Sequence, residues 1–274
     1  MSPTAATYET ILWDRPRPHV ARITLNRPKA MNAYNYHMCL ELQAAIAVYR
    51  DDDDLRALIL TGSGERAFCT GGDLGGGEPE HREAVGSAPM GFGREMREGM
   101  QAVVWALRRL DKPSIAMLRG YAVAGGLALA LGCDLRIAST TAKLGDTSNK
   151  AGLLPDEGGA WLFPHVMGLD RALKMTWLHE IYDAPTAMSL GLVTEVVEDA
   201  ALEARALGLA DALAAKAPLA VRLSKMMMAK ALETGFESSL ADAQMAVMIA
   251  NPSEDVQEGI AAFREKRPPV FKGN

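Results

Sequence analysis

The stretch SIAMLRGYAVAGGLALALGC, residues 114–133, decides the fold and the site of this chain. Its first part, residues 114–118, is a short apolar run after Pro113, which is typical of a buried strand. The glycine pair Gly125-Gly126 then opens a short apolar helix, whose first N–H groups have no partners inside the helix. A helix start of this kind is a ready site for an anion or a polarised oxygen.

An alternation of strands and helices extends outward from this stretch. Residues 19–26 alternate in side-chain type and are rich in β-branched residues, which predicts a strand, and residues 35–50 place apolar side chains at helical spacing. Further strands are predicted over 55–61 and 135–138, with a helix over 96–110. Strands separated by helices predict a parallel α/β arrangement.

Two regions depart from this alternation. Residues 71–93 are rich in glycine and poor in large apolar residues, so we expect a loop there. From about residue 200 the pattern is helical, and the last of the expected helices has Ser253 as its N-cap. The expected organisation is an α/β core with the site, residues 1–199, and a C-terminal helical oligomerisation region, residues 200–274. The helices of that region are expected over 200–216, 218–232, 236–250 and 253–266.

The composition disfavours several classes of function. The chain carries 29 Lys and Arg against 34 Asp and Glu, a net charge of -5, which disfavours nucleic acid as a partner. Cys39, Cys69 and Cys133 lack the spacing of a zinc site or a disulfide framework, so no metal is expected. The longest apolar run is too short to span a membrane, and the N-terminus lacks the pattern of a signal peptide. A cytoplasmic protein is the simplest expectation.

A second glycine turn lies earlier in the chain, at Ala67–Leu74 (AFCTGGDL), where the paired glycines allow backbone N–H groups to point outward. This turn and the glycine pair at Gly125-Gly126 belong to a set of motifs through which the chain resembles the crotonase, or enoyl-CoA hydratase/isomerase, superfamily over nearly its whole length. The motifs that carry the resemblance are Leu25-Asn26-Arg27-Pro28, Ala30, Asn32-Ala33, Ala67-Phe68, Gly71-Gly72-Asp73-Leu74, Lys112-Pro113, Gly120-Tyr121-Ala122, Gly125-Gly126, Cys133-Asp134, Gly191-Leu192-Val193 and Phe263-Arg264-Glu265-Lys266-Arg267.

The resemblance implies a crotonase-like α/β fold: a spiral core of repeated ββα turns with a C-terminal helical region, assembled as a homotrimer or a dimer of trimers. It also implies an acyl-CoA substrate, with coenzyme A as part of the substrate and no separate cofactor. The N–H groups of Gly72 and Gly125 would then form an oxyanion hole for the thioester oxygen. Two oriented donors in a dry site stabilise an enolate by roughly 3 kcal/mol per donor.

The chain departs from the family's hydratases at the two glutamates that typically activate water. Aligned on the glycine helix and on Leu144-Gly145, these positions hold Ala128 and Ser148. Alanine exchanges no proton, and serine without an adjacent base is a poor substitute. Ordinary hydration is therefore disfavoured.

Asp156 is the next candidate, because several family isomerases and the dehalogenating members have an aspartate at this place. A single carboxylate beside C2 and C4 of an unsaturated acyl chain could move a proton between them, which predicts double-bond isomerisation of an enoyl-CoA. The alternative structural role for Asp156 is an N-cap of the helix that follows.

Two further carboxylates are possible acid/base groups. Glu157 is expected to face solvent, whereas Asp146 is expected near Ser148, where it could line the pocket. They leave open a hydratase or another acyl-CoA lyase, hydrolase or dehalogenase. A CoA-binding scaffold without activity is a third class, and an RNA-binding relative is disfavoured by the acidic charge balance.

The resemblance also implies where coenzyme A binds. The nucleotide would lie along the backbone near the Gly72 turn and against basic side chains, with the alternative that the lysines are simply solvated. The candidates are Lys29, Ala30, Gly71, Asp73, Leu74 and, from a neighbouring subunit, Lys266.

Overall fold

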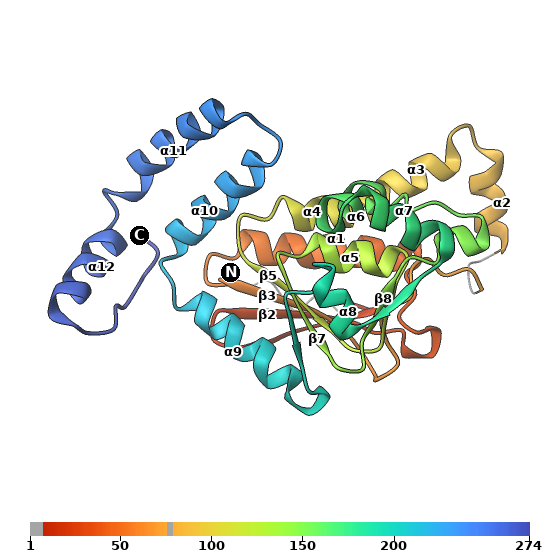
Figure 1. Cartoon of the computed structure of the whole chain (residues 1–274), viewed down its shortest axis with the longest axis horizontal. Coiled ribbons are helices and arrows are strands. Elements are labelled where there is room, and N and C mark those ends of the chain that lie inside the picture. The colour runs from red at the N-terminus through yellow and green to blue at the C-terminus, as the bar shows by residue number, and fades with distance from the viewer. Residues whose placement is uncertain (1–7, 76–78) are drawn as a thin grey trace.

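The computed structural model describes residues 8–75 and 79–274, which fold around two β-sheets (Figure 1). The larger sheet has the strand order β1-β2-β3-β5-β7-β10, and all neighbours are parallel except β1 and β2. Its strands are β1 (Ile11–Arg17), β2 (Val20–Leu25), β3 (Ala57–Gly62), β5 (Ser114–Leu118), β7 (Leu135–Ser139) and β10 (Glu195–Val197).

The large sheet is covered on both faces, which explains the apolar character of its central strands. Alternate residues of β3 face opposite layers: Leu58 and Leu60 join the main core, and Ile59 packs in a second cluster with Leu202 and Ala206. Figure 1 shows α9 (Leu202–Ala214) on one side of the sheet and most other helices on the opposite side. Those helices are α1 (Tyr36–Asp51), α4 (Met100–Arg108), α5 (Gly125–Gly132), α6 (Gly159–Met167) and α7 (Leu169–Leu178).

The smaller sheet has the order β4-β6-β8-β9 and carries the two glycine turns at the ends of its strands. Its strands are β4 (Ala67–Cys69), β6 (Tyr121–Val123), β8 (Lys143–Gly145) and β9 (Ile181–Asp183), followed by the short helix α8 (Ala184–Ser189). Because β4 and β6 are parallel neighbours, the turns that follow them emerge at the same edge. None of these strands was predicted from the sequence, since each has three residues, too few to show a period.

The strands and helices predicted over 19–26, 35–50, 55–61, 114–118 and 135–138 are confirmed within a few residues. The prediction of a loop over 71–93 is wrong for much of its length, because α2 (Pro79–Ser87) and α3 (Gly91–Glu98) lie within it. The glycines that suggested a loop include Gly86 and Gly91, which lie near helix ends, where glycine is well tolerated. Residues 76–78 of that range lie outside the described residues.

The C-terminal helices α10 (Pro218–Ala231), α11 (Phe236–Ala250) and α12 (Glu254–Glu265) form an arm that extends away from the core (Figure 1). The N-cap prediction for Ser253 is confirmed, because its side chain accepts a hydrogen bond from the N–H of Val256. The division of the chain at residue 199 stays a prediction, and α9, on its C-terminal side, packs on the large sheet.

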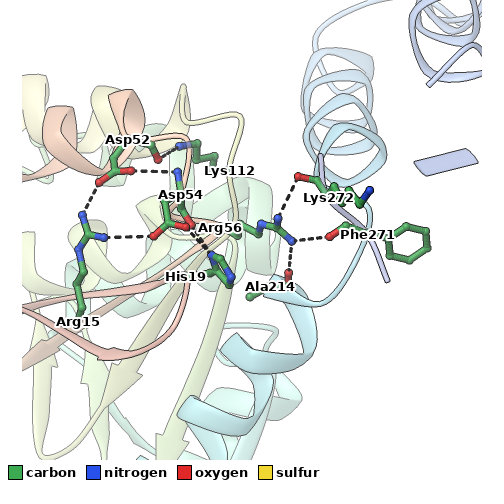
Figure 2. A network of polar contacts seen from close by, with 9 residues as sticks. All are labelled: Arg15, His19, Asp52, Asp54, Arg56, Lys112, Ala214, Phe271 and Lys272. Atoms are coloured by element: carbon green, nitrogen blue, oxygen red, sulfur yellow. Dashed lines mark hydrogen bonds and ion pairs between the residues drawn. The ribbon is translucent and has the colours of Figure 1, made fainter. Parts of the chain in front are cut away.

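The end of the chain ties this arm back to the core. Figure 2 shows the Arg56 guanidinium donating to the carbonyls of Ala214, Phe271 and Lys272, each at 3.2 Å. The buried Asp255 carboxylate of α12 accepts from the N–H groups of Lys272 and Gly273 at 2.8 and 2.9 Å. None of the helices in the described ranges is long and apolar enough to cross a membrane.

Candidate functional site

The N–H of Gly72 points away from the strand segment that it pairs with. Gly72 forms an isolated parallel bridge with Tyr34, in which the Tyr34 N–H donates to Gly71 and the Asp73 N–H donates to Tyr34, both at 2.9 Å. In a parallel bridge of this pattern, the residue between the two bonds directs its own N–H to the opposite side. The Gly72 N–H therefore points away from Tyr34 and is not used in this bridge.

The Gly125 N–H lies at the first residue of α5, just after a strained backbone position. Ala124 has φ 52° and ψ −129°, a conformation that alanine adopts only under constraint from its surroundings. An ideal Cβ on Gly71 would lie 3.3 Å from the Gly125 nitrogen, so the two turns are in contact. Within residues 8–75 and 79–274, neither the Gly72 nor the Gly125 N–H donates a hydrogen bond to another group. Two free donors at one edge are the arrangement that an oxyanion hole requires.

The Glu157 carboxylate lies directly beside these turns. Its Oε1 accepts a hydrogen bond from the Tyr34 hydroxyl at 2.6 Å. An ideal Cβ on Gly125 would lie only 2.3 Å from that Oε1 and 2.7 Å from the Tyr34 oxygen, and one on Gly72 would lie 3.6 Å from the Tyr34 oxygen. The absence of a side chain on Gly125 therefore makes room for the Tyr34–Glu157 pair, whereas a Cβ on Gly72 would make only an ordinary contact with Tyr34.

Glu157 is a buried carboxylate with one unsatisfied oxygen. It is 6% exposed, and its Oε2 is buried without a hydrogen-bond partner among the described residues. Burial raises the pKa of Glu157 to about 7, against a smaller lowering by the hydrogen bond from Tyr34. A carboxyl with a pKa near neutrality can both accept and return a proton. The expectation that Glu157 faces solvent is therefore wrong.

Asp146 is buried as well, but both of its oxygens are occupied. Oδ1 accepts from the N–H and the hydroxyl of Ser148 at 3.0 and 2.7 Å, and Oδ2 accepts from the Thr176 hydroxyl at 2.7 Å. This pattern fixes the chain between β8 and α7. Ser148 is thereby committed to Asp146, and Ala128 is buried in the core of α5.

Asp156 lies next to Glu157 in the chain but in a different environment. The residue is exposed, although partial desolvation of its carboxyl raises its pKa, and its carbonyl accepts from the Gln101 side chain at 2.7 Å. The alternative role as an N-cap is not observed, because Gly158 is the N-cap residue of α6 and no side chain caps this helix.

The candidates for coenzyme A binding lie in three places. Asp73 forms an ion pair with Arg27 at 2.7 Å, which connects the turn after β2 to the Gly72 turn. Its other oxygen accepts a hydrogen bond from the Gly75 N–H at 3.1 Å. Lys29 and Ala30 form a single helical turn beside it, with Lys29 exposed. Leu74, three residues after Gly71, is 58% exposed, whereas Lys266 is the C-cap residue of α12 on the arm.

Sequence reasoning missed Tyr34, which no periodicity singles out. It follows the Asn32-Ala33 motif and meets a partner 123 positions away in the chain. The sequence also favoured Asp156 over Glu157 as the acid/base group. A short segment before a glycine pair carries no signal that shows which side chain turns inward. The only local hint was Gly125, whose missing side chain leaves space for another residue's carboxylate.

Comparisons with known proteins identify the family of this chain. The family model described as enoyl-CoA hydratase/isomerase matches residues 16–274. The (E)-benzylidenesuccinyl-CoA hydratase of Thauera aromatica is 37% identical over 93% of this chain and 96% of its own length. The 1,2-epoxyphenylacetyl-CoA isomerase of Escherichia coli is 35% identical over 93% of this chain and 95% of its own.

A solved structure gives the same answer for the fold. The enoyl-CoA hydratase of Bacillus anthracis superposes with a TM-score of 0.89 at 32% identity, covering 97% of this chain and 100% of that one. The predicted crotonase-like α/β fold is thereby confirmed. Because the family model covers residues 16–274 and these relatives are similar over nearly the whole chain, the protein belongs to the enoyl-CoA hydratase/isomerase family of enzymes.

Proposed function

We propose that this enzyme catalyses double-bond isomerisation of an enoyl-CoA through a thioester enolate, with Glu157 carrying the proton. The observation that supports this most strongly is the single buried carboxylate beside the two glycine donors, with its pKa raised to about 7. The sequence favoured Asp156 for this role. The burial of Glu157 and the exposure of Asp156 now favour Glu157.

The proposed reaction needs one base and one oxyanion hole. The Gly72 and Gly125 N–H groups bind the thioester oxygen, and ionised Glu157 takes a proton from C2 of a 3-enoyl chain. The C–H electron pair delocalises over the acyl chain and the thioester oxygen as a dienolate, which the two donors stabilise. Glu157 then returns the proton to C4, so that the double bond lies between C2 and C3 and no atom is gained or lost.

Hydration is the second candidate function, because the Thauera aromatica relative is named a hydratase. Glu157 would then take a proton from water as the water attacks C3, and would later return it at C2. Product analysis in isotopically labelled water separates the two reactions, because only hydration places the labelled oxygen in the product. Binding of coenzyme A without turnover of any acyl-CoA would contradict both.

The test of the residue assignment compares two neighbouring substitutions. Glu157→Gln should lower kcat on a 3-enoyl-CoA by about 10³-fold, the contribution typical of a general acid/base group. Asp156→Asn, one position away in the same segment, should stay within about threefold of the parent. A large loss of kcat in Asp156→Asn with little loss in Glu157→Gln would assign the proton transfer to Asp156. Full activity of both variants would show that neither carboxylate carries the proton.

We also propose that the acyl-CoA enzyme is a homotrimer or a dimer of trimers, assembled through the C-terminal arm. The arm leaves large apolar side chains exposed, which is typical of a surface that another chain covers. These side chains include Met228, Phe236, Met245, Met248 and Phe263. In such an assembly Lys266 would reach a neighbour's coenzyme A, together with that neighbour's Lys29, Ala30, Gly71 and Leu74.

A further inference from the structure

Tyr34 connects the oxyanion turns to the carboxylate. Its backbone forms the bridge that orients Gly72, and its hydroxyl donates to Glu157 Oε1 at 2.6 Å. The same hydroxyl lies 2.7 Å from the position of a Cβ on Gly125. One residue therefore contacts both glycine donors and the acid/base group, with its own side chain buried.

The hydrogen bond makes the two oxygens of Glu157 unequal. Oε1 already accepts from Tyr34, whereas Oε2 is buried and has no partner in the described chain. A buried carboxylate oxygen without a donor is costly, and it is the more basic of the two because nothing stabilises its charge. The Tyr34 hydroxyl thereby determines which oxygen is available.

We propose that Tyr34 is a positioning residue for the enoyl-CoA reaction: it holds Oε1 of Glu157 and so leaves Oε2 to exchange the proton with the acyl chain. This inference rests on the proposed function of Glu157. Tyr34 stays a donor at every working pH, since burial and the Glu157 charge raise the pKa of its hydroxyl well above 10. Tyr34 therefore keeps the carboxylate in place in both protonation states.

The surroundings of Glu157 make this hydrogen bond important for its titration. Burial has the largest effect and raises the pKa, and the Asp156 and Asp146 carboxylates raise it further. The thiols of Cys39 and Cys69 are the other titratable groups nearby, and both are neutral because burial raises the pKa of each to about 12. Of these groups, only the Tyr34 side chain favours the ionised form of Glu157.

The experiment compares Tyr34→Phe with Tyr49→Phe, which removes a matched hydroxyl from another buried tyrosine. Tyr49 donates to the Pro113 carbonyl at 2.8 Å, away from the site, so its loss should affect folding alone. Infrared titration of the carboxyl band, assigned by its absence in Glu157→Gln, should show the Glu157 midpoint rising by about one pH unit in Tyr34→Phe. Tyr49→Phe should leave the midpoint unchanged.

Kinetics provide the second measurement. Tyr34→Phe should lower kcat about tenfold at neutral pH with KM nearly unchanged, and should shift the acidic limb of the pH profile upward. In the Glu157→Gln variant, adding Tyr34→Phe should lower kcat by less than about a further twofold, because the two residues act as one unit. An unchanged titration midpoint, or full additivity of the two losses, would overturn the proposal. The infrared midpoint requires no turnover, so it tests Tyr34 even if the substrate assignment fails.

Discussion

Two buried carboxylates 11 residues apart in the chain, Asp146 and Glu157, show how this fold separates structure from chemistry. Asp146 is fully buried and accepts three hydrogen bonds, from Ser148 and Thr176. Glu157 accepts one from another side chain, that of Tyr34, and keeps a buried oxygen without a partner. The first carboxylate holds two segments together, whereas the second is left able to react.

The difference follows from what each carboxylate has beside it. Two of the three donors to Asp146 belong to Ser148, two residues away in the local turn, and the third is the Thr176 hydroxyl of α7. Glu157 instead turns toward space left by a missing side chain at Gly125. A partly satisfied buried charge is unfavourable for folding, and such groups are concentrated at functional sites.

The largest expected effect comes from filling the space at Gly125. Gly125→Ala places a Cβ 2.3 Å from Glu157 Oε1, so the carboxylate must move. The same Cβ would lie 2.7 Å from the buried Tyr34 oxygen. We expect kcat to fall by about 10³-fold, because a displaced proton carrier is costly in rate. Gly72→Ala is the control: its Cβ would make ordinary contacts of 3.6 to 3.8 Å with Tyr34, and activity should fall only a few-fold. Equal losses in the two variants would contradict the placement of Glu157.

The second effect concerns stability rather than rate. Asp146→Ala leaves three buried donors without an acceptor and should lower the free energy of unfolding by about 3 kcal/mol. Glu157→Gln should leave that free energy unchanged or raise it. Denaturant unfolding of both variants at neutral pH measures the contrast. A large loss of stability in Glu157→Gln would show that this carboxylate is structural after all.

The smallest effect is the pH dependence of stability. Burial raises the pKa of Glu157 from 4.5 to about 7, so the folded state binds the proton more tightly than the unfolded chain does. The contribution of this bound proton to the free energy of unfolding is fully present below about pH 4.5 and is lost as the pH rises through 7. The free energy of unfolding should therefore fall by about 2 kcal/mol between pH 5 and 8. Glu157→Gln should abolish this component in unfolding curves at the two pH values. Asp146→Asn, the matched control, should retain it.

Much of the fold was predictable because its signals are local. Residues 114–118 and 135–138 read as buried strands, and the cap at Ser253 needed only its own turn. The helices α2 and α3 were missed because glycine enrichment over 71–93 outweighed the helix-forming residues between the glycines. The strands of the small sheet were missed because pairing, rather than side-chain pattern, defines three-residue strands.

The sequence by itself determined the two glycine turns and the family, because a backbone N–H donor needs no particular side chain and glycine marks where the chain must turn closely. Only the tertiary structure decided which carboxylate enters the site. Asp156 and Glu157 are adjacent and chemically alike, and their burial depends on packing against Tyr34 and Gly125, which lie far away in the chain. Desolvation, and with it the pKa that suits a proton carrier, is a property of that packing and not of the local sequence.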